Sequence, residues 1–131
     1  MQDALAILAF GQPVTLLSAR GAALYAGSAW WRGLMESACR RHPEVSVIDV
    51  LDCADAAGLA LGALRIGQRH IVLQPSAPGW AAVVAVATSL GAEVRSTRPP
   101  ALDMARPDAS RLLPGWLRGE LSAGDSRRTL G

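Results

Sequence analysis

Val45-Ser-Val-Ile-Asp-Val-Leu51 is an apolar run that ends at the polar loop Asp52-Cys-Ala-Asp55 and leads into the helix-like segment Ala56–Ile66. Gly67 stops that segment, and a second apolar run, Ile71–Leu73, follows it. A strand, a short loop, a helix and another strand form a βαβ unit, in which the two strands run parallel. This stretch therefore predicts an α/β fold whose loops gather at the carboxyl edge of a parallel sheet.

The same alternation continues on both sides of this unit. Val14–Leu17 reads as an earlier strand followed by the helix Ala29–Arg41, and Gly79–Leu90 reads as a later helix followed by a weaker edge strand, Glu93–Thr97. The pattern resembles Rossmann-like and flavodoxin-like modules. We therefore expect three layers, with a mainly parallel four-stranded sheet in the order 2-1-3-4 and helices on both faces.

The ends of the chain read differently. Asp3–Phe10 resembles a short helix, and the length of 131 residues suits one domain, which we expect over residues 1–98. Residues 99–131 are rich in Pro, Gly and Arg, with one amphipathic segment at Leu112–Leu121. We expect this C-terminal arm to pack on the core or on a neighbouring subunit, and to fray from about Ser122.

Composition excludes several kinds of chemistry. The chain has no lysine, which rules out a Schiff-base lysine, a pyridoxal-phosphate anchor and a Walker A lysine. The Ala-, Arg- and Gly-rich composition indicates a GC-rich bacterial genome. We expect no cofactor, and the net charge of +2 gives little support to a nucleic-acid partner.

Nothing in the sequence predicts a membrane or secretory role. Met1–Phe10 lacks the basic region of a secretory leader, and the apolar stretch Gly79–Ala92 is too short to cross a bilayer. Cys39 and Cys53 are the only cysteines and are far apart in sequence. We therefore expect a cytoplasmic protein with reduced thiols and no membrane partner.

No charged residue occurs in the expected helix Gly79–Leu90 or in the stretch Ala56–Leu64 of the helix before it. A helix on a sheet normally turns a polar face to water, and one without a polar face is usually covered on both sides. Self-association explains such cover most simply, so we expect a homo-oligomer, in its simplest form a two-fold dimer.

The loop between the first strand and its helix is the best candidate for a ligand site. Gly21 and Gly27 permit close backbone approach, Arg20 can clamp an anion, and Ser28 opens a helix. The spacing of the glycines matches neither a dinucleotide fingerprint nor a P-loop. With the loops after the later strands, to which Arg98 also belongs, the predicted ligand-binding residues are Ser18, Arg20, Gly21, Tyr25, Gly27, Ser28, Gln74 and Ser76.

The alternative is catalysis at the same edge, with Cys53 as a nucleophile or Asp52 as an acid or base. A helix-capping aspartate beside a half-buried cysteine is the preferred explanation of these residues. Asp49 and Asp52 point to opposite sides of a strand, so we expect no metal site. His42 and His70 fall at the amino edge, away from any nucleophile at the loops, which argues against a hydrolase.

The sequence thus favours a non-catalytic, self-associating module that binds a small anionic ligand at the carboxyl edge. A small enzyme and a purely structural interaction subunit remain the alternatives.

Overall fold

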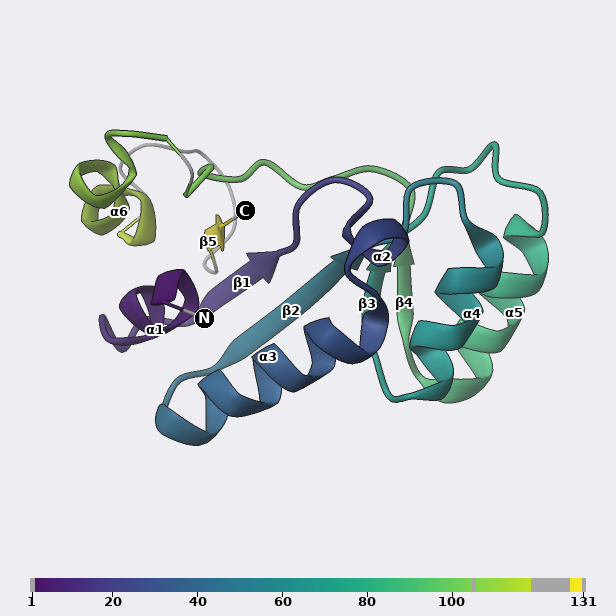
Figure 1. Ribbon diagram of the computed structural model, residues 1–131, viewed down its shortest axis with the longest axis horizontal. Coiled ribbons are helices and arrows are strands. Elements are labelled where there is room, and N and C mark those ends of the chain that lie inside the picture. Colours follow the sequence, from purple (N-terminus) through teal and green to yellow (C-terminus); the bar gives the residue numbers. More distant parts are fainter. Residues whose placement is uncertain (1, 105, 119–127, 131) are drawn as a thin grey trace. The chain divides into compact units, whose positions relative to one another are not determined.

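The computed structural model describes residues 2–104, 106–118 and 128–130. It is an α/β fold with a parallel sheet, as the sequence predicts (Figure 1). The strands are β1 (Val14–Leu17), β2 (Val47–Asp52), β3 (His70–Val72), β4 (Glu93–Arg95) and β5 (Arg128–Leu130).

The order of the strands in the sheet is β4-β3-β2-β1-β5, so the predicted order 2-1-3-4 is wrong. The Cys53 amide donates to the Val72 carbonyl oxygen, which shows that β2 lies directly beside β3. On its other side, the Val50 carbonyl oxygen of β2 accepts from the Ser18 amide at the end of β1. Each of the first four strands therefore neighbours its successor in sequence, which is the commonest arrangement. The predicted order would have placed the first strand between the second and the third, and the structure does not have that pairing.

Helices connect these strands. They are α1 (Gln2–Leu8), α2 (Ala22–Tyr25), α3 (Ser28–Arg41), α4 (Ala57–Arg65), α5 (Trp80–Leu90) and α6 (Ala109–Leu117). Most bounds differ from the predicted ones by one or two residues, but α2 lies where an irregular connection was expected. The predicted fraying from about Ser122 concerns residues 122–127, which lie outside the described residues, whereas the backbone of β5 pairs in parallel with β1.

Helix α5 ends at Gly91, as the sequence predicts. Gly91 has a φ of 71°, in the left-handed region that other residues rarely adopt. The Ala92 amide then folds back to donate to the Ala87 carbonyl oxygen, the helix termination that a left-handed glycine typically supports. The chain leaves this turn directly into β4.

The chain divides into two compact units. Unit 1 contains Met1–Leu17, Leu34–Ile48 and Pro99–Gly131, and unit 2 contains Ser18–Gly33 and Asp49–Arg98. In unit 1 the largest fully buried side chains are Leu8 and Val14. In unit 2 they include Leu51, Leu64, Ile71 and Leu73.

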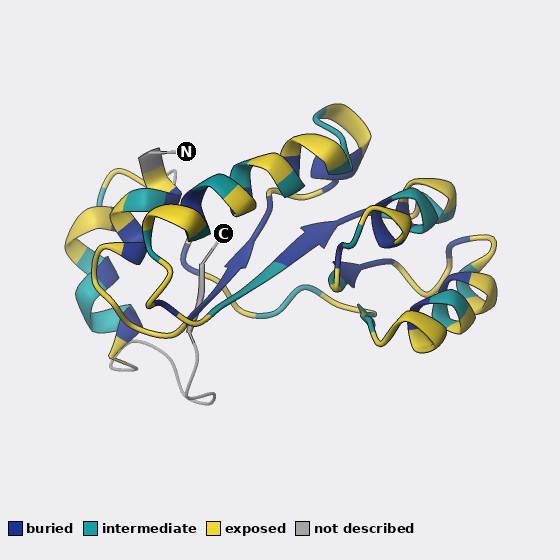
Figure 2. Cartoon of the chain, turned by 90° about the horizontal axis from the view of Figure 1, so that it is seen from below, coloured by how far each residue is buried: buried dark blue, intermediate teal, exposed yellow. Residues whose placement is uncertain are grey.

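Burial follows the strands and one side of each helix (Figure 2). Trp31 of α3 is buried, whereas its neighbour Trp30 is half exposed. None of the helices in the described part of the chain combines the length and the hydrophobicity that crossing a bilayer requires.

Candidate functional site

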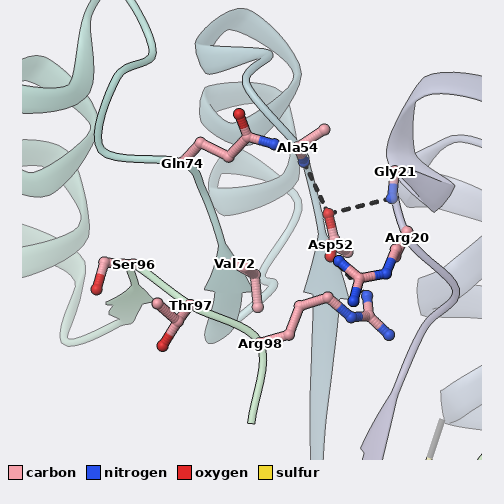
Figure 3. Close-up of a pocket in the computed structure, with 9 residues that line it drawn as sticks. All are labelled: Arg20, Gly21, Asp52, Ala54, Val72, Gln74, Ser96, Thr97 and Arg98. Atoms are coloured by element: carbon pink, nitrogen blue, oxygen red, sulfur yellow. Dashed lines mark hydrogen bonds and ion pairs between the residues drawn. The ribbon is translucent and has the colours of Figure 1, made fainter.

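A cavity of about 380 Å³ opens at the carboxyl ends of β2, β3 and β4, and all of its lining residues belong to unit 2. The parallel register places Asp52 opposite Val72 and Val72 opposite Arg95, so these three strands end at one level. The residues that line the cavity are Arg20, Gly21, Asp52, Ala54, Val72, Gln74, Ser96, Thr97 and Arg98 (Figure 3).

Asp52 is the centre of this site. Its side chain is almost completely buried, at 3% exposure for the residue. One carboxylate oxygen, Oδ1, accepts from the Gly21 amide at 3.1 Å and from the Ala54 amide at 2.8 Å. The Asp52 amide donates to the Ser18 hydroxyl oxygen at 2.9 Å. These bonds fix the loop after β1 against the end of β2.

The second carboxylate oxygen of Asp52 holds an arginine. Oδ2 lies 2.6 Å from Nη1 of Arg98, whose side chain is 19% exposed. Buried charges require a partner and hydrogen bonds to offset the loss of solvation. Asp52 has both, and the ion pair fixes the Arg98 guanidinium at the wall of the cavity (Figure 3).

Arg20 brings a second guanidinium to the same wall. Figure 3 shows it beside the Arg98 guanidinium and close to Asp52. Among the described residues, no carboxylate or carbonyl oxygen binds the Arg20 side chain. Among the described residues, the Asp52 carboxylate therefore pairs with the Arg98 guanidinium alone, and the Arg20 donors remain available to a ligand.

Gly21 makes this arrangement possible. Its φ of 64° lies in the left-handed region, and a Cβ at this position would come within 3.3 Å of Cδ1 of Leu24. The left-handed turn allows the Gly21 amide to reach Asp52. Ala54 also adopts a left-handed conformation, with a φ of 50°, which costs an alanine about 1 kcal/mol or more. Strained backbone of this kind clusters at functional sites.

The predicted ligand-binding residues separate into two groups. Arg20, Gly21 and Gln74 line the cavity, whereas the other five do not. Ser18 is buried and supports Asp52, and Tyr25 is 70% exposed at the end of α2. Gly27, Ser28 and exposed Ser76 also lie outside the lining, because α2 separates the glycines and the chain turns away after Gln74.

Cys53 does not have the properties of a nucleophile. Its side chain is fully buried, and Sγ donates weakly to the Leu51 carbonyl oxygen. Burial, together with the negative charge of Asp52, raises the pKa of the Cys53 thiol to about 12. The thiol is therefore protonated at neutral pH, opposite to the effect that a helix dipole alone would have.

The Asp49 carboxylate has a structural role, because it accepts three side-chain hydrogen bonds. Its Oδ2 accepts from Trp31 Nε1 at 2.9 Å, from Arg32 Nη2 at 2.8 Å and from Gln68 Nε2 at 3.0 Å. Asp52 faces different partners, as the alternation of side chains along a strand requires. Within the described ranges, no three His, Cys, Asp or Glu side chains gather closely enough to hold a metal ion.

His70 is the first residue of β3, at the end opposite the cavity, and pairs with Glu93 at 3.8 Å. His42 follows α3 in unit 1 and pairs with Glu44 at 3.6 Å. Neither imidazole lines the cavity.

Sequence reasoning did not single out the lining residues Ala54, Val72, Ser96 and Thr97, and it missed the role of Asp52. Ser96 and Thr97 are the last two residues of the predicted edge strand Glu93–Thr97, but β4 ends at Arg95 and leaves them in the loop at the cavity. Asp52 was considered as a cap or an acid, and no sequence pattern pairs it with Arg98.

In comparisons with known proteins, no protein family matches this chain and no curated protein is significantly similar to it in sequence. The site must therefore be interpreted from its own geometry.

Proposed function

We propose that this protein is a non-catalytic binding module for a small anionic ligand, held in the cavity between Arg20 and Arg98. The observation that carries the proposal is the Arg20 guanidinium, which has no partner among the described residues and lies beside a second guanidinium that Asp52 fixes in place. Arginine binds carboxylate and phosphate oxygens through two parallel hydrogen bonds, which gives both affinity and orientation. The carboxyl edge of a parallel sheet is also where α/β folds bind ligands.

The buried, protonated Cys53 and the position of His70 at the opposite end of β3 support binding in preference to catalysis. A general base must come within hydrogen-bond reach of the proton that it removes. Asp52, the only carboxylate among the described lining residues, already accepts hydrogen bonds from two amides and from Arg98.

Replacing Arg20 with Ala is the direct test. Acetate is titrated into the protein, and binding is followed through the NMR signals of the Gly21 amide and the Arg98 side chain. The Arg20→Ala variant should bind acetate at least about tenfold more weakly, because it loses a charge-assisted pair worth about 1.5–3 kcal/mol.

Arg65→Ala is the matched control, because Arg65 is exposed on α4 and lies outside the cavity lining. It removes the same charge and should leave the acetate affinity unchanged. Equal acetate affinities in the wild type and the Arg20→Ala variant would reject the site.

We also propose that the protein forms a dimer through α4 and α5. The two helices pack on one another within unit 2. Apolar side chains on and next to them are exposed to solvent. Leu59, Ile66 and Leu90 are each more than two-fifths exposed, and a second copy packed against these helices would remove their side chains from water. Ala81 and Ala85 of α5 are exposed as well, and α5 has no charged residue that would oppose close contact.

Sedimentation velocity at micromolar concentration tests this proposal. The wild type should sediment as a dimer, and Ala85→Arg should shift it to monomer, because an unpaired charge in an apolar interface costs several kcal/mol. Ser76→Arg adds the same charge to an exposed loop and should leave the dimer intact. A monomeric wild type would contradict the proposal.

A further inference from the structure

We propose that the ligand is a small, hydroxylated monocarboxylate, and that Asp52 selects it over phosphate esters by setting the charge of the cavity. This inference rests on the proposed function, since it specifies which anion the same cavity binds. The evidence comes from the charges of the lining, from the neutral groups across the cavity and from its size.

The charges of the lining favour a single negative charge. Arg20 and Arg98 each contribute +1 and Asp52 contributes −1, so the lining carries a net charge of +1. A ligand with one carboxylate would neutralise this net charge. A phosphate monoester carries close to two negative charges at neutral pH and would place an uncompensated charge near the buried Asp52 carboxylate. The repulsion between this extra negative charge and the Asp52 carboxylate disfavours binding of a phosphate monoester.

The other side of the cavity offers neutral hydrogen-bonding groups. Ser96 and Thr97 carry hydroxyls on the side away from Arg20, and Gln74 carries an amide at the upper rim (Figure 3). All three residues are exposed, and among the described residues their side chains make no hydrogen bond. Hydroxyl and amide groups both donate and accept, which matches the hydroxyl groups of a ligand.

The size and the lining exclude a nucleotide base as the main recognition element. A volume of about 380 Å³ is at the small end of ligand cavities, which span about 300–1,000 Å³. None of the nine described lining residues is aromatic, so the cavity provides no ring on which a base would stack. A compact aliphatic acid with one or more hydroxyls fits these constraints.

Three probes of similar size test the wild-type protein by NMR titration, namely glycerate, propionate and glycerol 3-phosphate. We expect glycerate to bind at least about tenfold more tightly than propionate, which lacks the hydroxyls, and more tightly than glycerol 3-phosphate. Tighter binding of glycerol 3-phosphate, or equal binding of glycerate and propionate, would overturn this inference and leave the anion site intact. Binding of none of the three would instead overturn the proposed function.

Two variants test the role of the cavity charge. Asp52→Asn keeps the oxygen that accepts from Gly21 and Ala54 but raises the net charge of the lining to +2. The affinity ratio of glycerol 3-phosphate to glycerate should then rise about tenfold or more. Ser96→Arg makes the same change of charge at an exposed position, so it gives the answer even if Asp52→Asn does not fold. Ratios that stay unchanged in the variants would show that charge does not set the choice, because a general loss of structure weakens both probes alike.

Discussion

Replacing Asp52 with Ala should lower the free energy of unfolding by about 3–5 kcal/mol, a large part of the stability of a typical domain. The Asp52 carboxylate accepts hydrogen bonds from two backbone amides and one guanidinium, with donor–acceptor distances of 2.6–3.1 Å. Its removal leaves the Arg98 charge without a partner in a partly buried position, and leaves the Gly21 amide without an acceptor. Urea denaturation followed by circular dichroism measures this change.

Asp55→Ala is the matched control for this prediction. Asp55 lies three residues further along the same loop and is exposed, so its replacement should change stability by less than about 0.5 kcal/mol. Asp52→Asn should fall between the two, because the amide oxygen still accepts from Gly21 and Ala54. A loss below about 1 kcal/mol in Asp52→Ala would show that this carboxylate does not organise the site.

Replacing Asp49 with Ala should cost about 2–4 kcal/mol. One oxygen of Asp49 accepts from Trp31, Arg32 and Gln68, at 2.8–3.0 Å. Gln68 is almost fully buried, and its amide nitrogen also donates to the backbone oxygens of Asp49 and His70. Without the carboxylate, the Arg32 charge and the Trp31 indole lose their partner inside unit 2.

Chemical denaturation measures this loss as well. Glu36→Ala removes an exposed carboxylate from α3 and should leave stability within about 0.5 kcal/mol of the wild type. A similarly small effect of Asp49→Ala would contradict the structural role assigned to Asp49. A destabilised variant that retains acetate binding would separate this network from the anion site.

The two aspartates of β2 illustrate how far sequence reasoning reaches. The apolar run identifies the strand, and the alternation of side chains correctly separates Asp49 from Asp52. The sequence also identifies the loops after the strands as the place to look, and Arg20, Gly21 and Gln74 do line the cavity. Their partners come from far along the chain, since Arg98 is 46 residues from Asp52. No local pattern encodes a contact at that separation.

The loop after β1 shows the same limit. The sequence predicts that Gly21, Gly27 and Ser28 of this loop all bind the ligand. The structure inserts α2 between Gly21 and Gly27, so only the first glycine reaches the cavity. Four residues suffice for this helical turn, which is too short to leave a periodic signal.

The amino-acid sequence by itself determined the α/β class, the parallel direction of the strands and the positions of most elements, because apolar periodicity and glycine stops act over a few neighbouring residues. Only the tertiary structure decided the order of the strands and the pairing of Arg98 with Asp52. Both depend on which distant segments pack together, and that choice is made by burial and charge pairing across the whole sheet rather than by any one segment.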